Sequence, residues 1–61
     1  VRDKLTPMEY SIAMLASKGW TNQEIAKQLS LSPNTIKHYL SRIFHLLDIE
    51  KREELKPFVN K

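Results

Sequence analysis

Residues 21–47 read TNQEIAKQLSLSPNTIKHYLSRIFHLL and contain two helix starts in close succession. Thr21 and Glu24 have the spacing of a capping box, in which hydroxyl and carboxylate each bond the other residue's backbone amide. Ser32-Pro33 is the second start, because serine caps helices well and proline suits the first helical position.

Apolar residues recur at helical spacing after both starts. In the second helix they are Ile36, Leu40, Ile43, Phe44 and Leu47. The sequence therefore predicts helices over residues 22–29 and 33–47 with a short break between them. Two helices joined this closely are typical of a helix-turn-helix, here over about residues 22–41.

A further capping box, Thr6-Pro7-Met8-Glu9, precedes this stretch. It predicts a first helix over residues 7–18, which Gly19 ends by adopting a left-handed conformation.

The end of the chain predicts a short fourth helix over about residues 51–56. Pro57 disfavours the helical conformation of Lys56, so we expect this helix to stop there or to resume with a kink. The fold class is therefore all-α, a small four-helix bundle containing a helix-turn-helix, with its fourth helix short or kinked at Pro57.

The 61 residues suffice for one small domain, residues 1–61, and a cofactor-sized pocket would consume most of its core. The size therefore argues against an enzyme. The chain has no cysteine and two histidines, so we expect no disulfide, metal or cofactor. Asp48, Glu50, Glu53 and Glu54 alternate with basic residues and are interpreted as a solvated surface, not as an acid–base pair.

No signal-peptide pattern opens the sequence, and no apolar run in it is long enough to cross a membrane. Because it has no cysteine and needs no oxidising compartment, we expect a cytoplasmic protein. It begins with Val1 and not with methionine, so we expect it to be part of a longer protein.

The net charge of +3 is unevenly distributed. Residues 22–47 hold three basic side chains, one acidic side chain and both histidines, whereas residues 48–61 hold four of each charge. Residues 33–47 contain no acid at all. The side of this helix opposite its apolar stripe, called the donor face below, carries Asn34, Lys37, His38, Ser41, Arg42 and His45, with Lys37 on its flank.

DNA phosphates repel carboxylates, and base edges in the major groove accept hydrogen bonds from side chains of this kind. A polar, solvated surface that happens to lack acids is the alternative interpretation of the donor face. The start of the second helix offers backbone amides beside Asn22 and Gln23, and Lys27 follows one turn later, so these residues are candidates to contact phosphates. A simply capped helix is the alternative there.

Four runs together resemble the LuxR-type (NarL/FixJ- or GerE-like) DNA-binding domain of bacterial transcription regulators. The resemblance covers residues 5 to about 56, and its runs are Leu5-Thr6-Pro7, TNQEIA at residues 21–26, LSPNTIK at residues 31–37 and Ser41-Arg42-Ile43.

The resemblance implies a C-terminal output domain whose third helix enters the major groove. It implies that Lys37, His38 and Ser41 approach bases, to which the donor face adds Asn34. It also implies backbone contacts by Asn22, Gln23, Thr35 and Arg42, to which our interpretation of the surface adds Lys27 and His45. The fourth helix of the family commonly pairs two copies, and this implies a dimer contact through Leu55 and Phe58.

The chain departs from the family pattern at several positions. Met8 and Ser11 replace an arginine and a glutamate, which implies that a charged network around the first helix is missing. Asp48 replaces a glycine, and we expect it to adopt the left-handed conformation at some cost. Pro57 interrupts the pairing helix.

These observations predict sequence-specific binding of double-stranded DNA, as a homodimer, by the output domain of a bacterial response regulator or related transcription regulator. A receiver or ligand-sensing domain before residue 1 and RNA polymerase are the further partners implied. A protein-interaction module on the same scaffold is one alternative, and promoter binding like that of sigma-factor region four is another.

Overall fold

The computed structural model describes residues 5–59, which form helices and turns without a strand. The elements are α1 (Pro7–Ser17), α2 (Asn22–Leu29), α3 (Pro33–Leu47), the 3-10 helix η2 (Arg52–Leu55) and α4 (Lys56–Val59). The predicted fold class is therefore confirmed. The bounds of α2 and α3 are those expected from the sequence, and α1 ends at Ser17, just before the expected residue.

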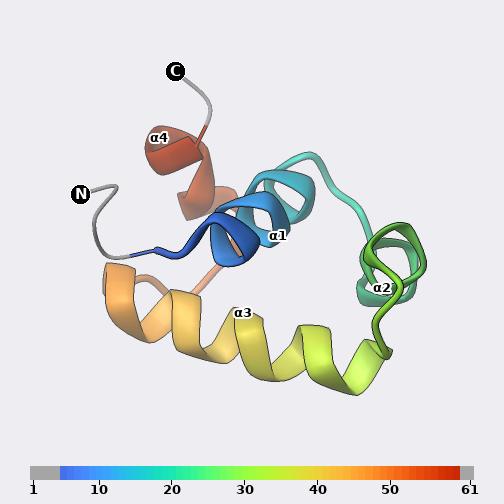
Figure 1. Cartoon of the computed structure of the whole chain (residues 1–61). Helices are drawn as coiled ribbons and strands as arrows, with labels where there is room; N and C mark the ends of the chain where they lie inside the picture. The colour runs from blue at the N-terminus through green and yellow to red at the C-terminus, as the bar shows by residue number, and fades with distance from the viewer. Residues whose placement is uncertain (1–4, 60–61) are drawn as a thin grey trace.

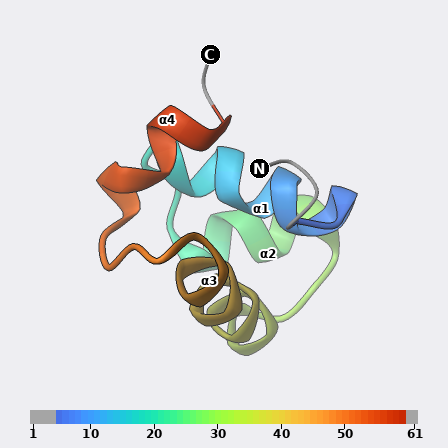
Figure 2. The same ribbon diagram turned by 90° about the vertical axis from the view of Figure 1, so that its left-hand side faces the viewer.

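Helix α1 lies in the middle of the molecule, and the other elements pack around it. Helix α3 runs along one edge, and α2 packs against it on the side of its N-terminus (Figure 1). The C-terminal segment, η2 with α4, lies on the other side of α1 from α3 in both Figure 1 and Figure 2. One side of α3 consequently faces away from all the other helices.

Both predicted capping boxes are present at the starts of α1 and α2. The Glu9 carboxylate accepts from the Thr6 amide at 3.0 Å, and the Thr6 hydroxyl accepts from the Glu9 amide at 3.2 Å. The corresponding distances between Thr21 and Glu24 are 2.8 and 3.2 Å. Each box satisfies two backbone amides that the helix itself leaves without partners.

Three residues with positive φ follow the helices. Gly19, with φ 92°, comes after α1 as expected, and Asp48, with φ 57°, ends α3 in the left-handed conformation that the family's glycine implies. Ser30 ends α2 with φ 60°, which the sequence does not predict, because serine is not among the residues that favour this region. These turns let the chain reverse direction between closely packed helices.

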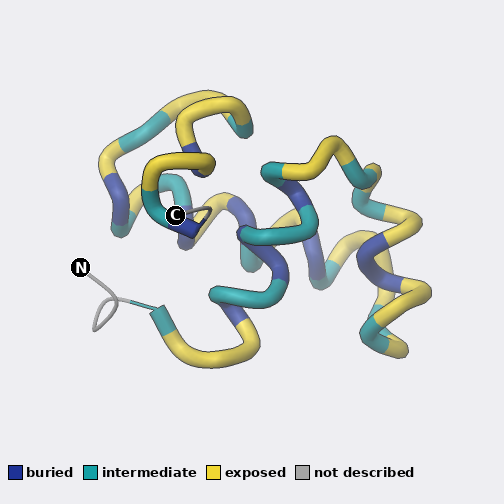
Figure 3. Tube along the Cα trace, turned by 90° about the horizontal axis from the view of Figure 1, so that it is seen from above, coloured by how far each residue is buried: buried dark blue, intermediate teal, exposed yellow. Residues whose placement is uncertain are grey.

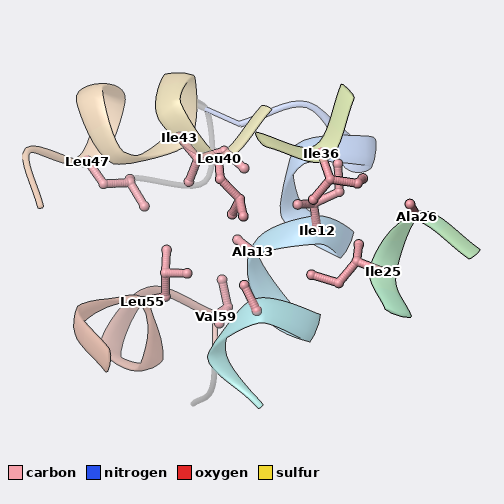
Figure 4. Packing of buried hydrophobic residues seen from close by; sticks show 11 residues of the cluster. Ile12, Ala13, Ile25, Ala26, Ile36, Leu40, Ile43, Leu47, Leu55 and Val59 are labelled. Carbon is pink, nitrogen blue, oxygen red and sulfur yellow. The ribbon is translucent and has the colours of Figure 1, made fainter. Parts of the chain in front are cut away.

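The core is formed by side chains from every helix. Figure 4 shows them converging from α1, α2, α3 and the C-terminal segment, and Figure 3 shows buried positions recurring along the helices between exposed ones. Four of the five apolar residues predicted for the α3 stripe are buried, and Phe44 is half-buried. The buried hydrophobic residues are Ile12, Ala13, Ala16, Ile25, Ala26, Ile36, Leu40, Ile43, Leu47, Leu55 and Val59.

The C-terminal segment corrects one expectation. Lys56 is helical, with φ −54° and ψ −45°, although a proline follows it. Pro57 lies in the first turn of α4, where a missing amide is tolerated, so the chain passes from η2 into α4 without leaving the helical region. Leu55 is fully buried in the core of the single chain, and the expected dimer contact through Leu55 and Phe58 stays a prediction. Tyr10 Oη fastens the segment to α1 by donating to the Val59 carbonyl oxygen at 3.2 Å.

Candidate functional site

The donor face of α3 is exposed along its whole length. All six of its residues are exposed, whereas the opposite side of the helix is buried against α1 and α2. The apolar stripe fixes this orientation, because turning α3 about its axis would expose the isoleucines and leucines of the core. The helix therefore presents a row of hydrogen-bond donors, two of them basic, on the open side seen in Figure 2.

Thr35 lies beside the donor face but is engaged in the cap of α3. The Ser32 hydroxyl accepts from the Thr35 amide at 3.1 Å, and the two hydroxyl oxygens are hydrogen-bonded at 2.8 Å. Thr35 is half-buried. Any contact that Thr35 makes with a ligand therefore depends on the conformation of the turn between α2 and α3, which contains Ser32.

The start of α2 is held by a residue that the sequence reasoning missed. Arg52, in η2, donates through one terminal nitrogen to the Trp20 carbonyl oxygen at 2.7 Å and through the other to Asn22 Oδ1. Asn22 is half-buried; its oxygen accepts from Arg52, and its NH₂ group is the side-chain donor that it can offer to a ligand. Gln23 and Lys27 are both exposed.

Arg42 connects the donor face with the start of α1. Its Nε lies 2.7 Å from Glu9 Oε2, and the Glu9 side chain is only 3% exposed whereas that of Arg42 is 66% exposed. The implied absence of a charged network around the first helix therefore needs correction. Met8 and Ser11 carry no charge, but Glu9 reaches across to α3 instead. Neither Glu9 nor Arg52 was singled out as a site residue, because their partners are far away in the sequence.

The acidic residues after α3 include a structural carboxylate, Glu54. Glu54 Oε2 accepts from the backbone amides of Glu50 and Lys51, each at 3.0 Å. These hydrogen bonds, that from Glu50 first, lower the pKa of Glu54 below its ordinary value. The carboxylate acts here as the cap of η2.

An open surface groove of about 600 Å³ lies beside the turn between α1 and α2. It does not enter the core and is lined by Lys18, Gly19, Trp20, Glu24, Lys27 and Gln28. In residues 5–59 no cluster of three or more histidine, aspartate or glutamate side chains is placed to hold a metal ion. None of the helices described is long and apolar enough to cross a bilayer.

Comparison with protein families matches residues 3–58 to the model described as bacterial regulatory proteins, luxR family. No solved structure gives a significant match to the chain.

Several relatives are similar over most of the chain. The two-component response regulator PprB of Pseudomonas aeruginosa is 40% identical over 85% of the chain and 19% of its own length. The transcriptional regulatory protein ComA of Bacillus subtilis is 45% identical over 87% of the chain and 25% of its own. The DNA-binding transcriptional activator DevR/DosR of Mycobacterium tuberculosis is 37% identical over 88% of the chain and 25% of its own length.

The chain thus spans a quarter or less of each of these three relatives. The family match, by contrast, covers nearly all of it and includes both helices of the helix-turn-helix and the donor face. This chain belongs to the luxR family of bacterial regulatory proteins.

Proposed function

We propose that the chain is the DNA-binding output domain of a bacterial transcriptional regulator, which recognises specific sequences by placing α3 in the major groove. The observation that carries this proposal is the donor face, an exposed helix surface that is free of acids and turned away from the rest of the bundle. A helix fits the major groove of B-DNA, and the groove's base edges accept hydrogen bonds from donors such as these.

Base contacts are assigned to Asn34, Lys37, His38 and Ser41, which are all exposed. In this arrangement Lys37 donates to guanine oxygen and nitrogen acceptors, and the uncharged side chains read neighbouring bases.

Phosphate contacts are assigned to residues on either side of these positions, where they set the register of the domain on the duplex. Arg42 and Lys27 supply charge, and Asn22 supplies its NH₂ group, because a phosphate oxygen accepts hydrogen bonds and this group is the donor of the side chain. The full set is Asn22, Gln23, Lys27, Thr35, Arg42 and His45.

The domain is proposed to act as a pair of copies within a longer protein. A single small module buries only about 600–1,000 Å² on DNA, so one copy alone binds weakly. Phe58 is half-buried and retains exposed surface on α4, so the contact between copies is assigned to it without Leu55. Response regulators among the relatives support a receiver domain preceding this chain, and RNA polymerase is a further partner to test.

The test is a selection from a random pool of DNA duplexes at two ionic strengths. We expect enriched sequences with two half-sites at a regular spacing. If each copy neutralises about three phosphates, the logarithm of affinity falls with the logarithm of salt concentration at a slope of about −2.7 per half-site. Failure to bind any duplex at low salt would contradict the proposal and favour a protein-interaction module.

A further inference from the structure

The contact between Glu9 and Arg42 uses both oxygens of a buried carboxylate. Glu9 Oε1 accepts from the Thr6 amide at 3.0 Å, and Oε2 lies 2.7 Å from Arg42 Nε. The carboxylate is almost entirely enclosed, and the arginine side chain is mostly exposed. Glu9 therefore holds the Arg42 guanidinium at the surface through Nε, the guanidinium nitrogen closest to the backbone of Arg42.

A guanidinium group is planar and carries five N–H donors in a fixed fork. When Nε is bonded, the two terminal nitrogens remain to donate, and the orientation of the plane is restricted. An arginine that is oriented before binding loses less conformational entropy when it meets a phosphate. Fork-like pairs between arginine and phosphate also depend strongly on geometry.

We propose that Glu9 is a positioning residue for DNA binding, which holds Arg42 with its terminal nitrogens available to a backbone phosphate. This inference rests on the proposed function. It makes the first turn of α1, which itself lies outside the helix-turn-helix, part of the phosphate-binding apparatus. The Thr6–Glu9 capping box thereby orients a side chain of α3 as well as starting α1.

A purely electrostatic role for Glu9 would have the opposite effect on binding. A carboxylate beside Arg42 reduces the attraction between that arginine and a phosphate, so removing its charge would tighten DNA binding. If Glu9 positions Arg42, removing the contact weakens binding although the net charge becomes more favourable. The sign of the change therefore separates the two roles.

The substitution Glu9→Gln isolates the contact from the cap. The amide oxygen of glutamine can still accept from the Thr6 amide, but its NH₂ group cannot accept from Arg42 Nε. We expect Glu9→Gln to weaken binding of the 61-residue chain to a random-sequence duplex by about 3- to 10-fold. In an Arg42→Ala background the same substitution should have almost no effect.

Glu54→Gln is the matched control, because Glu54 also caps backbone amides but, among residues 5–59, forms no hydrogen bond or ion pair with α3. Its DNA affinity should equal that of the unmodified chain. Circular dichroism and thermal unfolding verify that each variant is folded at the temperature of the binding measurement. An NMR signal of the Arg42 Nε–H that is protected in the unmodified chain and lost in Glu9→Gln would report the contact itself.

Unchanged or tighter binding by Glu9→Gln overturns the inference, as does an equal loss in both backgrounds. If Glu9→Gln does not fold, Arg42→Lys takes its place, since lysine keeps the charge but lacks the fork. It should bind several-fold more weakly, and affinity equal to that of the unmodified chain overturns the inference. If the unmodified chain does not bind DNA, the proposed function and this inference are both wrong. If only the inference is wrong, the unmodified chain still binds DNA.

Discussion

Lys37 is exposed on the flank of the donor face and is the basic residue assigned to base contacts. We expect Lys37→Ala to weaken binding to the selected DNA by about 1–3 kcal/mol and to relax the preference for bases at its position. Titration of the variant against the selected duplex and against single-base changes measures both effects.

Lys18 provides the matched control for Lys37. It is also exposed and basic, but it lies after α1, beside the surface groove. Lys18→Ala removes the same charge and should leave base preference unaltered. If both variants bind and discriminate alike, Lys37 contributes only general attraction.

Glu54 predicts a dependence of stability on pH. Its pKa is lowered by the hydrogen bonds from the Glu50 and Lys51 amides, so folding favours the ionised carboxylate. This contribution is complete above the ordinary pKa of glutamate and is lost as the pH falls through the lowered value. Glu54→Gln should therefore reduce the unfolding temperature near neutral pH, and the difference from the unmodified chain should shrink under acidic conditions. A pH-independent difference in a series of melting curves would argue against this account.

At the scale of single elements, the end of α3 carries a conformational cost. Asp48 has φ 57°, a region that glycine enters without the steric penalty of a Cβ atom. We expect Asp48→Gly to stabilise the domain by about 0.5–1 kcal/mol, measured by chemical denaturation. Gln28→Gly, inside α2, is the opposite case and should destabilise by about 1 kcal/mol. The prediction fails if Asp48→Gly is the more damaging of the two.

The link between η2 and α2 depends on Arg52. Arg52→Ala removes the hydrogen bonds to the Trp20 carbonyl oxygen and to Asn22, so the unfolding free energy should fall by about 1–3 kcal/mol. Lys51→Ala removes a neighbouring exposed charge and should change stability little. Equal unfolding temperatures for the two variants would mean that these hydrogen bonds contribute nothing net.

The starts of the helices can be predicted from the sequence, because a cap involves residues within one turn. Thr6 and Thr21 are each followed, three residues later, by the glutamate of a capping box, and Ser32 is followed by a proline at the first helical position. The contacts of Glu9 and Arg52 cannot be found in this way. They join distant segments, and each depends on how the helices pack after they have formed.

For the molecule as a whole, the orientation of the donor face was predictable, because the apolar stripe of α3 must be buried. The environment of each side chain in the C-terminal segment could not be predicted from the sequence. Leu55 and Phe58 are both apolar and belong to the same short segment, so periodicity gives no means of deciding which one the single chain buries. The structure assigns Leu55 to the core and leaves Phe58 partly exposed.

This assignment predicts different behaviour for the two residues. Leu55→Ala should cost about 2–5 kcal/mol, a large share of the stability of a domain this small, at every protein concentration. Phe58→Ala should mainly weaken the pairing of copies, so its effect should depend on concentration. Unfolding curves at several concentrations, together with sedimentation, distinguish the two. If the loss of stability in Leu55→Ala depends on protein concentration, Leu55 takes part in the contact between copies.

The central position of α1 has one more consequence. Helix α1 separates α3 from α4, so if two copies pair through α4 as proposed, their α3 helices are separated by a distance that includes the thickness of both α1 helices. Ala13 and Ala16 keep that layer thin, because both are buried and small. Under the proposed pairing, enlarging either side chain would move the two α3 helices apart and alter the separation of DNA half-sites that the pair can span, while leaving the base preference of each α3 helix unchanged.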